Sequence, residues 1–576
     1  MQFDYIIVGA GSSGCVLANR LSHDPGARVL LIEAGPEDTA WSLKMPAAML
    51  LNLKKTSVNW AFQGEPEPEL NGRQMKHDRG KTLGGSSSIN GMVYIRGHAQ
   101  DFEGWRRAGC EGWGYADVLP YFKRMESYGG GDSEFRGRDG PMYVSRPIPE
   151  NPLNLAFLQA GKEAGYPSSD DLNGFRQEGF GVFDRSVYKG ERWSTARGYL
   201  APVRARPNLR ILTGCLVHRV LIRDGNAIGV EYKDPNGHVV SASAAKEVIL
   251  SAGAIGSPHL LMLSGIGPRE HLKQMGIGIV ADLSGVGQNL NDHPDFVMKF
   301  KCTKPVSIWP QTRPLASALA GIQWFMRKTG ICATNHFDVV ACVRSQSGVQ
   351  YPDIQLTLSP VAVDFDTWAP LQEHAFQIHV GLMRAYSRGW VALRSADPAV
   401  PPRIQVNYLK DPRDREILRK GVEIVRELVA QPAFSDLCGV EIFPGADVRS
   451  APDLNRQFSD YTASQWHLSG TARMGSTDDE GAVVDTAGRV RGVKGLRVVD
   501  ASIMPMVTNG NTNAPTIMMA EKLSDTILRV PTLPPIEKPI WENPASTENS
   551  AKVDPNLLTG PGTTEQSDQR NANHQH

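Results

Sequence analysis

The sequence predicts a mixed α/β protein that combines a domain built on a parallel sheet with a second, α+β domain built on an antiparallel sheet. Strand and helix patterns alternate from residue 3 to about 35, which indicates a β-α-β opening. The segment from about 298 to 463 differs, because residues 371–398 alternate like antiparallel strands and residues 414–431 have a helical period. A buried strand at 494–505 and an amphipathic helix at 513–530 follow. The first domain is therefore expected to be completed only after residue 464.

Length, charge and cysteine content narrow the class of protein. The 576 residues exceed one ordinary core, and 61 basic residues balance 61 acidic ones. This balance gives no indication of nucleic acid or of an anionic membrane surface as a partner. The seven cysteines are scattered without a C-x-x-C, and no apolar run reaches the ~18 residues of a membrane span. We therefore expect a cytoplasmic protein with a small-molecule partner, and a peripheral membrane contact stays open.

The first strand runs directly into a glycine-rich turn. "FDYIIVGAGSSG" places Gly9, Gly11 and Gly14 as G-x-G-x-x-G between a hydrophobic strand and a helix. The first glycine permits the tight turn, the second admits a pyrophosphate, and the third allows close helix packing. Glu33 ends the next strand 19 residues after Gly14, close to the ~20-residue offset of an acid that meets a ribose hydroxyl. A Rossmann-like site for NAD, or for the adenosine half of FAD, is predicted.

A second glycine- and serine-rich element, "RGKTLGGSSSINGMVYIRG" at 79–97, has many backbone donors and no apolar period. It is suited to wrapping a pyrophosphate or the polar edge of a flavin. A phosphate-binding P-loop is excluded by spacing, because Met75 stands where that motif requires glycine.

Six ordered motifs resemble the glucose-methanol-choline (GMC) flavoprotein oxidoreductases, over residues 3 to about 530. Beyond the two glycine-rich elements they are "GAIGSPHLLMLSGIG", "GVGQNLNDHP", "WHLSGTARMG" and "RVVDASIMPMVTNGNTNAPTIMMAEK". The nearest branch is that of choline dehydrogenases and alcohol dehydrogenases. The resemblance implies an FAD-binding domain formed by 1–155, 196–297 and 464–530, and a substrate domain formed by 156–195 and 298–463. The Pro-, Asn- and Gln-rich tail, 531–576, is expected to be disordered.

The resemblance also implies which residues contact FAD. They are Gly9, Gly11, Ser12, Ser13, Gly14, Glu33, Ala34, Gly84, Gly85, Ser86, Asn90, Gly91, Met92, Val93, Val217, Asp500, Ala501 and Thr512. Members with covalent FAD carry a histidine where this chain has Ile89, and isoleucine has no nucleophile. We therefore expect noncovalent FAD.

Oxidation of an alcohol needs a base, a group that stabilises the alkoxide, and a hydride acceptor. The resemblance places the active-site histidine at His467 and a second hydrogen-bonding group at Asn511, with Asn513 a close competitor. We expect His467 to act as the base and Asn511 to contact the substrate oxygen. His293 and Asp292 of "NDHP" are interpreted as structural, because two adjacent residues do not form a metal site and no H-E-x-x-H occurs. No metal site is predicted.

The substrate is less well defined. The loop 333–345 resembles a substrate-facing loop, which makes His336 and Asp338 pocket candidates, and Trp466 adjoins the base. Choline dehydrogenases tend to have Glu at position 338 and Pro at 468, where this chain has Asp and Leu, so a nonpolar or aromatic primary alcohol is equally open. Electrons are expected to pass to a quinone or another acceptor. The alternatives are an alcohol oxidase that uses O₂ and a hydroxynitrile lyase with structural FAD. The oligomeric state is not predicted.

Overall fold

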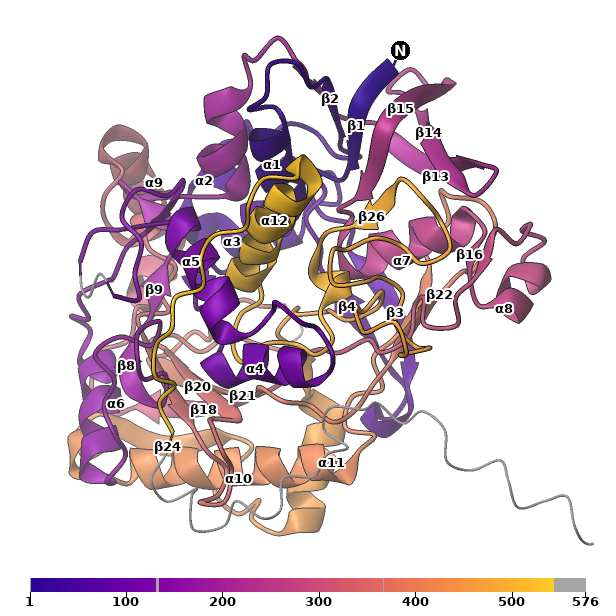
Figure 1. Cartoon of the computed structure of the whole chain (residues 1–576). Helices are drawn as coiled ribbons and strands as arrows, with labels where there is room; N and C mark the ends of the chain where they lie inside the picture. Colours follow the sequence, from indigo (N-terminus) through magenta and orange to yellow (C-terminus); the bar gives the residue numbers. More distant parts are fainter. Residues whose placement is uncertain (1, 131–133, 366, 543–576) are drawn as a thin grey trace, which may run out of the picture.

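The computed structural model describes residues 2–130, 134–365 and 367–542, and its described strands form two large sheets (Figure 1). The first sheet has the order β12-β2-β1-β15-β14-β13, with β26 beside β15. Its strands are β1 (Gln2–Val8), β2 (Val29–Ile32), β12 (Leu209–Leu212), β13 (Leu216–Arg223), β14 (Asn226–Lys233), β15 (Val239–Leu250) and β26 (Leu496–Val498). The pairs β12-β2, β2-β1, β1-β15 and β15-β26 are parallel, and β13-β14 and β14-β15 are antiparallel. The predicted parallel-sheet domain is confirmed.

The second sheet is antiparallel throughout and has the order β24-β18-β21-β20-β19-β8, with β25 beside β18. Its strands are β8 (Gly179–Val182), β18 (Pro294–Cys302), β19 (Val339–Val343), β20 (Ile354–Ser359), β21 (Ala375–Leu382), β24 (Cys438–Phe443) and β25 (Ala463–Ser464). β18 begins at Pro294, four residues before the domain boundary expected at 298, and β8 lies within the segment 156–195 expected to belong to the same domain. The expected domain boundaries stay predictions.

Helices cover the outer faces of both sheets. α1 (Ser12–Leu21) and α12 (Asn513–Leu528) pack against each other beside the first sheet, and α5 (Tyr115–Met125) packs on α12. The helix α12 is buried along most of its length, so it is less amphipathic than its sequence suggested. α10 (Pro412–Val429) lies across β20 and β21 of the second sheet, where its apolar stripe meets the strands.

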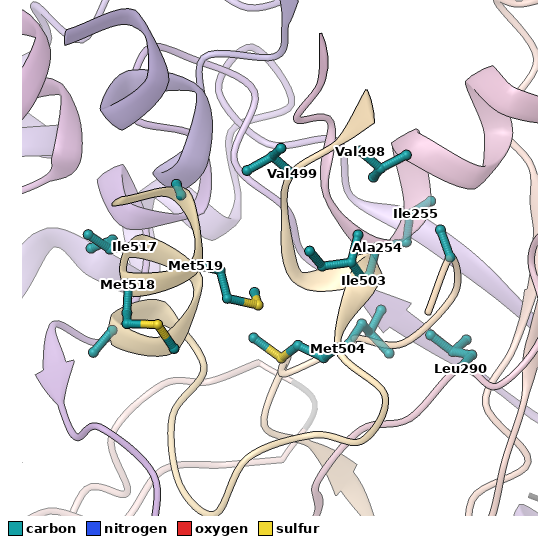
Figure 2. Close-up of a cluster of buried hydrophobic side chains, with 14 of the residues drawn as sticks. Ala254, Ile255, Leu290, Val498, Val499, Ile503, Met504, Ile517, Met518 and Met519 are labelled. Atoms are coloured by element: carbon teal, nitrogen blue, oxygen red, sulfur yellow. The ribbon is translucent and has the colours of Figure 1, made fainter. Parts of the chain in front are cut away.

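Buried apolar side chains join the segments of the first domain that are far apart in sequence. Figure 2 shows Ile255 of α7 (Gly253–Leu263), Val498 of β26, Ile503, and Met519 of α12 in one cluster. Each is at most 2% exposed. The C-terminal segment therefore completes the core begun by β1, as the sequence predicted.

Part of the segment expected to be disordered is packed on this domain. Residues 531–542 run along α5, where the amide of Ile536 donates to the carbonyl of Ala116 (3.0 Å) and the amide of Leu533 to the Tyr121 hydroxyl (3.0 Å) (Figure 1). The start of the disordered tail, expected at residue 531, was therefore placed too early in the chain. Its remainder, 543–576, lies outside the described residues.

Candidate active site

A cavity of about 820 Å³ is lined by residues of both domains. The domain of the first sheet contributes the end of β1 and residues of the helices α1, α7 and α12. The second sheet contributes one face of β18, β20 and β21. Its volume is within the range of roughly 300–1,000 Å³ for small-molecule and cofactor sites. The two sheets therefore meet at a single large site.

Two helices begin at the cavity wall. Ser12 and Ser13 open α1, and Thr512 and Asn513 stand at the start of α12. The Ser12 hydroxyl donates to Oδ1 of Asn513 (2.7 Å), which links the two helix starts. The free N–H groups and positive dipole ends of both helices favour a pyrophosphate here.

Glycine is required where backbone segments meet. A Cβ on Gly14 would lie 1.9 Å from the carbonyl oxygen of Gly9, and one on Gly85 would lie 2.7 Å from Cα of Gly11. Gly84 has φ +85°, and its amide donates to the carbonyl of Ala10 (2.7 Å). Gly14 and Gly84 therefore shape the loops and do not line the cavity, whereas every other residue predicted to contact FAD does line it.

Glu33 stands at the end of β2 with its carboxylate held by backbone donors. Its two oxygens accept from the amides of Ala10 (2.9 Å) and Gly35 (2.8 Å). Burial raises its pKa to about 7, and the amide donors oppose that rise. Because the side chain also lines the cavity, its remaining lone pairs are suited to ribose hydroxyls.

Several buried polar atoms on the cavity wall lack a partner among the described residues. They are Nη2 of Arg79, Nε2 of His259, Oε1 of Gln355, Nε1 of Trp466 and Oδ1 of Asn511. Buried polar groups in proteins are almost always hydrogen-bonded. Together with the glycine loop and the helix starts, these atoms fit an extended polar ligand of the FAD type.

His467 lies in a segment fixed by Asp292. One carboxylate oxygen of Asp292 accepts from the backbone amide of His467 (2.7 Å), and the other accepts from the hydroxyls of Ser464 and Tyr408 (2.5 Å each). Trp466, beside the histidine, has φ +60°, and its amide donates to Oγ of Ser464 (2.8 Å). These bonds hold the turn that directs the imidazole of His467 to the cavity.

Both ring nitrogens of His467 have a neighbour. Nδ2 of Asn511 lies 3.1 Å from Nε2, and Nδ1 of His293 lies 2.9 Å from Nδ1. An amide NH₂ can only donate, so Nε2 accepts, and Nδ1 carries the proton and donates to His293. This tautomer leaves the lone pair on Nε2, next to the cavity.

Burial keeps this pair of histidines neutral. The pKa of His467 is well below its ordinary value, because the ring is buried and because His293 and Arg79 lie close to it. Burial lowers the pKa of His293 to about 3. A neutral His467 can take up a proton, as a general base must.

The geometry also bears on the competing partner of His467. Asn511 is the asparagine next to Nε2, while Asn513 accepts from Ser12 at the start of α12. This arrangement favours Asn511 as the group beside the base.

The interpretation of "NDHP" as merely structural was incomplete, because His293 and Asp292 both contact the His467 segment.

The predicted substrate residues separate into two groups. His336 and Trp466 line the cavity, and burial lowers the pKa of His336 to about 4. Asp338 is not among the lining residues, and its carboxylate accepts from Asn154 (3.2 Å) and Arg185 (3.3 Å). The structure gives no support to the expectation that Asp338 faces the substrate, because this carboxylate lies outside the cavity lining and is held by an arginine.

Sequence reasoning missed the polar face of the second sheet. Asp295 of β18 and His379 of β21 line the cavity, and Nδ1 of His379 lies 2.7 Å from Oδ2 of Asp295. Nε2 of Gln465 donates to Oδ1 of the same carboxylate (3.1 Å). Alternate residues of these strands face the cavity, namely 295, 297 and 299 of β18, 355, 357 and 359 of β20, and 377 and 379 of β21. The alternation of residues 371–398 was the available signal, and it predicted antiparallel strands without indicating which face lines a cavity.

Within the described ranges, no group of three His, Cys, Asp or Glu side chains is arranged to hold a metal ion. No helix in those ranges is both long and apolar enough to cross a bilayer.

A dinucleotide cradle joined to a histidine-containing substrate cavity defines an oxidoreductase that works with a bound dinucleotide cofactor. Comparison with known proteins specifies the family. The chain matches the GMC oxidoreductase family over residues 3–295 and 385–520, and it belongs to that family. It is therefore an FAD-dependent enzyme, as the resemblance implied.

Curated relatives match nearly the whole chain. An oxygen-dependent choline dehydrogenase of Brucella canis is 47% identical over 546 residues, 94% of this chain and 99% of that protein. The mitochondrial choline dehydrogenase of Homo sapiens is 46% identical over 548 residues, 94% and 92% of the two chains.

Solved structures share the fold. Pyridoxine 4-oxidase from Mesorbium loti is 31% identical with a TM-score of 0.83, covering 91% of this chain and 99% of that one. A formate oxidase of Aspergillus oryzae RIB40 is 27% identical with a TM-score of 0.86, covering 92% and 98%.

Proposed function

We propose that this protein oxidises a primary alcohol to an aldehyde, with His467 as the base and FAD as the hydride acceptor. The observation that carries the proposal is the contact between His467 and Asn511 at the wall of a cavity that continues into the dinucleotide cradle. Bound FAD would supply the two-electron acceptor for the hydride that leaves the alcohol carbon. The chain itself supplies binding, orientation and proton transfer.

Nε2 of His467 would accept the hydroxyl proton, because this tautomer leaves Nε2 unprotonated at the cavity wall, and the Asn511 amide that donates to it would turn to the alcohol oxygen when the substrate binds. The Asn511 amide would donate to the same oxygen as negative charge develops on it. Since an amide does not titrate, the pair holds one ionisable group. His293 would hold Nδ1–H of His467 in place, so it is a positioning residue.

We propose a choline-like cationic alcohol as the substrate class. The relatives named choline dehydrogenases support this choice. In the cavity, the buried carboxylate of Asp295 and the indole rings of Trp368 and Trp466, whose centroids are 5.7 Å apart, provide groups that attract a quaternary ammonium. Asp295 would thus be the acidic side chain of the substrate pocket, a position for which the sequence had suggested Asp338.

An anaerobic screen of flavin bleaching tests both statements. The purified flavoprotein is mixed with choline, straight-chain alkanols, polyols or benzylic alcohols, and the 450 nm band is followed. Bleaching by choline at the lowest concentration supports the proposal, whereas bleaching by benzyl alcohol alone refutes the substrate class. No bleaching by any alcohol would refute alcohol oxidation and favour the lyase alternative.

The variant His467→Ala tests the base. We expect bleaching to slow by roughly 10²-fold or more, the usual share of general acid–base catalysis, with flavin content retained. His238, just before β15, has a 74% exposed side chain and lies outside the cavity lining, so it offers a matched His238→Ala control that should keep the wild-type rate. A His467→Ala enzyme that bleaches at the wild-type rate would contradict the assignment.

The electron acceptor is proposed to be a quinone or a similar carrier. O₂ is the second candidate, because relatives of this chain are named oxygen-dependent. Reoxidation of the reduced enzyme by air-saturated buffer and by a soluble quinone analogue, with H₂O₂ measured in parallel, separates a dehydrogenase from an oxidase.

A further inference from the structure

The surface around α9 (Pro314–Arg327) differs from the rest of the molecule. Leu315, Leu319, Ile322 and Met326 recur at helical spacing along one side of this helix, and their exposures are 75%, 59%, 55% and 77%. Phe325 and Trp41, of the neighbouring α2 (Trp41–Lys44), extend the same surface, with ring centroids 5.6 Å apart (Figure 1). We call these six residues the α9 patch.

The opposite side of α9 fixes its orientation. Trp324 is 1% exposed, and its indole nitrogen donates to the carbonyl of Gly190 (2.7 Å). It packs with Met45, Ala48 and Cys332 in a small buried cluster. Because this side is anchored, the α9 patch cannot turn inward without breaking that cluster. Contiguous exposed apolar surface of this kind marks an interaction site.

The charged side chains of the two segments that carry the α9 patch are all basic. Residues 41–57 and 309–330 contain no Asp or Glu, although the whole chain has 61 acidic and 61 basic residues. Lys54, Lys55, Arg313 and Arg327 are exposed there, and none of them forms an ion pair with a described carboxylate. Lys328, at the end of α9, does pair with Glu191 (3.4 Å). Exposed cations beside an amphipathic helix are suited to an anionic lipid surface.

The α9 patch also lies next to the active-site cavity. α2 leads through Pro46–Ala48 into α3 (Met49–Leu53), and Met49, Leu50 and Leu53 line the cavity. Lys54 lines it as well, directly after α3. The element that supports Trp41 therefore continues into the wall of the substrate site.

We propose that the α9 patch docks the protein on an anionic lipid surface, with the apolar side chains in the headgroup boundary and the four cations on lipid phosphates. Docking here would bring the cavity wall formed by α3 to the membrane, where a lipid-soluble electron acceptor or alcohol is concentrated. The net charge of the whole chain gives no sign of this basic surface, because acidic residues elsewhere in the chain balance its cations. The inference stands independently of the substrate proposed above.

Co-sedimentation of the holoenzyme with vesicles tests the docking. Vesicles of phosphatidylcholine with 30% phosphatidylglycerol are compared with phosphatidylcholine alone, at low and high salt. We expect binding to the anionic vesicles that weakens with salt, and at least a tenfold lower partition for Leu315→Glu combined with Leu319→Glu. Flavin content and activity with a soluble dye should not change, because both side chains are exposed.

Val239→Glu combined with Val440→Glu is the matched control, since these exposed valines lie on β15 and β24 away from α9. The control should bind like the wild type. Absence of wild-type binding, or equal binding by the α9 variant, overturns the proposal. So does a homodimer in light scattering that the α9 variant converts to monomer without any vesicle binding, because the α9 patch would then contact a second copy of this chain.

Discussion

His293 offers the sharpest test of the catalytic geometry. Its Nδ1 lies 2.9 Å from Nδ1 of His467, and it is fully buried. Replacing it in His293→Leu removes the acceptor of the His467 Nδ1 proton. The proton would then be better placed on Nε2, where the Asn511 amide could turn to accept it through Oδ1, and the base would lose the lone pair that faces the substrate.

The expected magnitude follows from the unpaired donor. A buried N–H without an acceptor costs about 1–3 kcal/mol. At 1.36 kcal/mol per factor of ten, this corresponds to roughly a 5- to 150-fold lower kcat/KM. The loss should appear in kcat with KM little changed, because His293 has no place in binding the alcohol. A merely structural role would instead lower the melting temperature and the flavin content.

The assay compares three variants by stopped-flow flavin reduction and thermal unfolding. His293→Asn places an amide oxygen near the lost nitrogen and should recover much of the rate. His77→Leu is the control, because His77 is equally buried and lies outside the cavity lining. The reasoning is refuted if His293→Leu reduces flavin at the wild-type rate, or if the Leu and Asn variants are equally slow.

Three further predictions concern protonation, the cofactor and the glycine turn. Because burial holds the pKa of His467 well below 6.5, kcat/KM should stay level between pH 8 and 6, and a fall with an apparent pKa near 6.5 would contradict this. With Ile89 in place of a histidine, acid precipitation should release all FAD into the supernatant, and yellow protein in the pellet would indicate a covalent bond. Gly14→Ala should abolish FAD retention in the purified protein, since its Cβ would meet the Gly9 carbonyl at 1.9 Å, whereas Gly278→Ala, which meets nothing within 4 Å, should retain it.

The same depressed pKa has a consequence for stability. Below pH 6.5 the unfolded chain protonates His467, while the folded chain keeps it neutral. The free energy of unfolding therefore decreases as pH falls through 6.5. His293, His98 and His77, whose pKa values burial lowers to about 3, act in the same direction.

Local patterns were sufficient to predict the nucleotide half of the site. Gly9, Gly14 and Glu33 act through short-range backbone geometry, so their spacing in the sequence contains most of the information. The β-α-β opening and the return of the chain at β26 and α12 were predicted for the same reason. Parallel strands with near-continuous apolar runs are recognisable one at a time.

The substrate half depends on contacts between distant segments. His293 and His467 are 174 residues apart, and no local pattern joins them. Asp338 was chosen from a family resemblance, yet its carboxylate is held by Arg185, which belongs to β9 (Asp184–Arg185). The alternating pattern of residues 371–398 was recognised, but only the position of the sheet beside the cavity shows that Gln377 and His379 face a ligand site and not solvent.

A strongly depressed pKa makes a histidine a weak base, and a weak base takes up a proton less readily. The neighbours of His467 decide the matter. Before the alcohol reacts, burial disfavours a charged ring, and His293 and Arg79 add to this effect, so His467 is held in its neutral form. In the proposed reaction the hydroxyl proton would move to Nε2, and the new imidazolium would lie beside the alkoxide, where their attraction in a buried site is large. Proton uptake by His467 would thus be favoured while that alkoxide is present, which would couple the base to the reacting substrate.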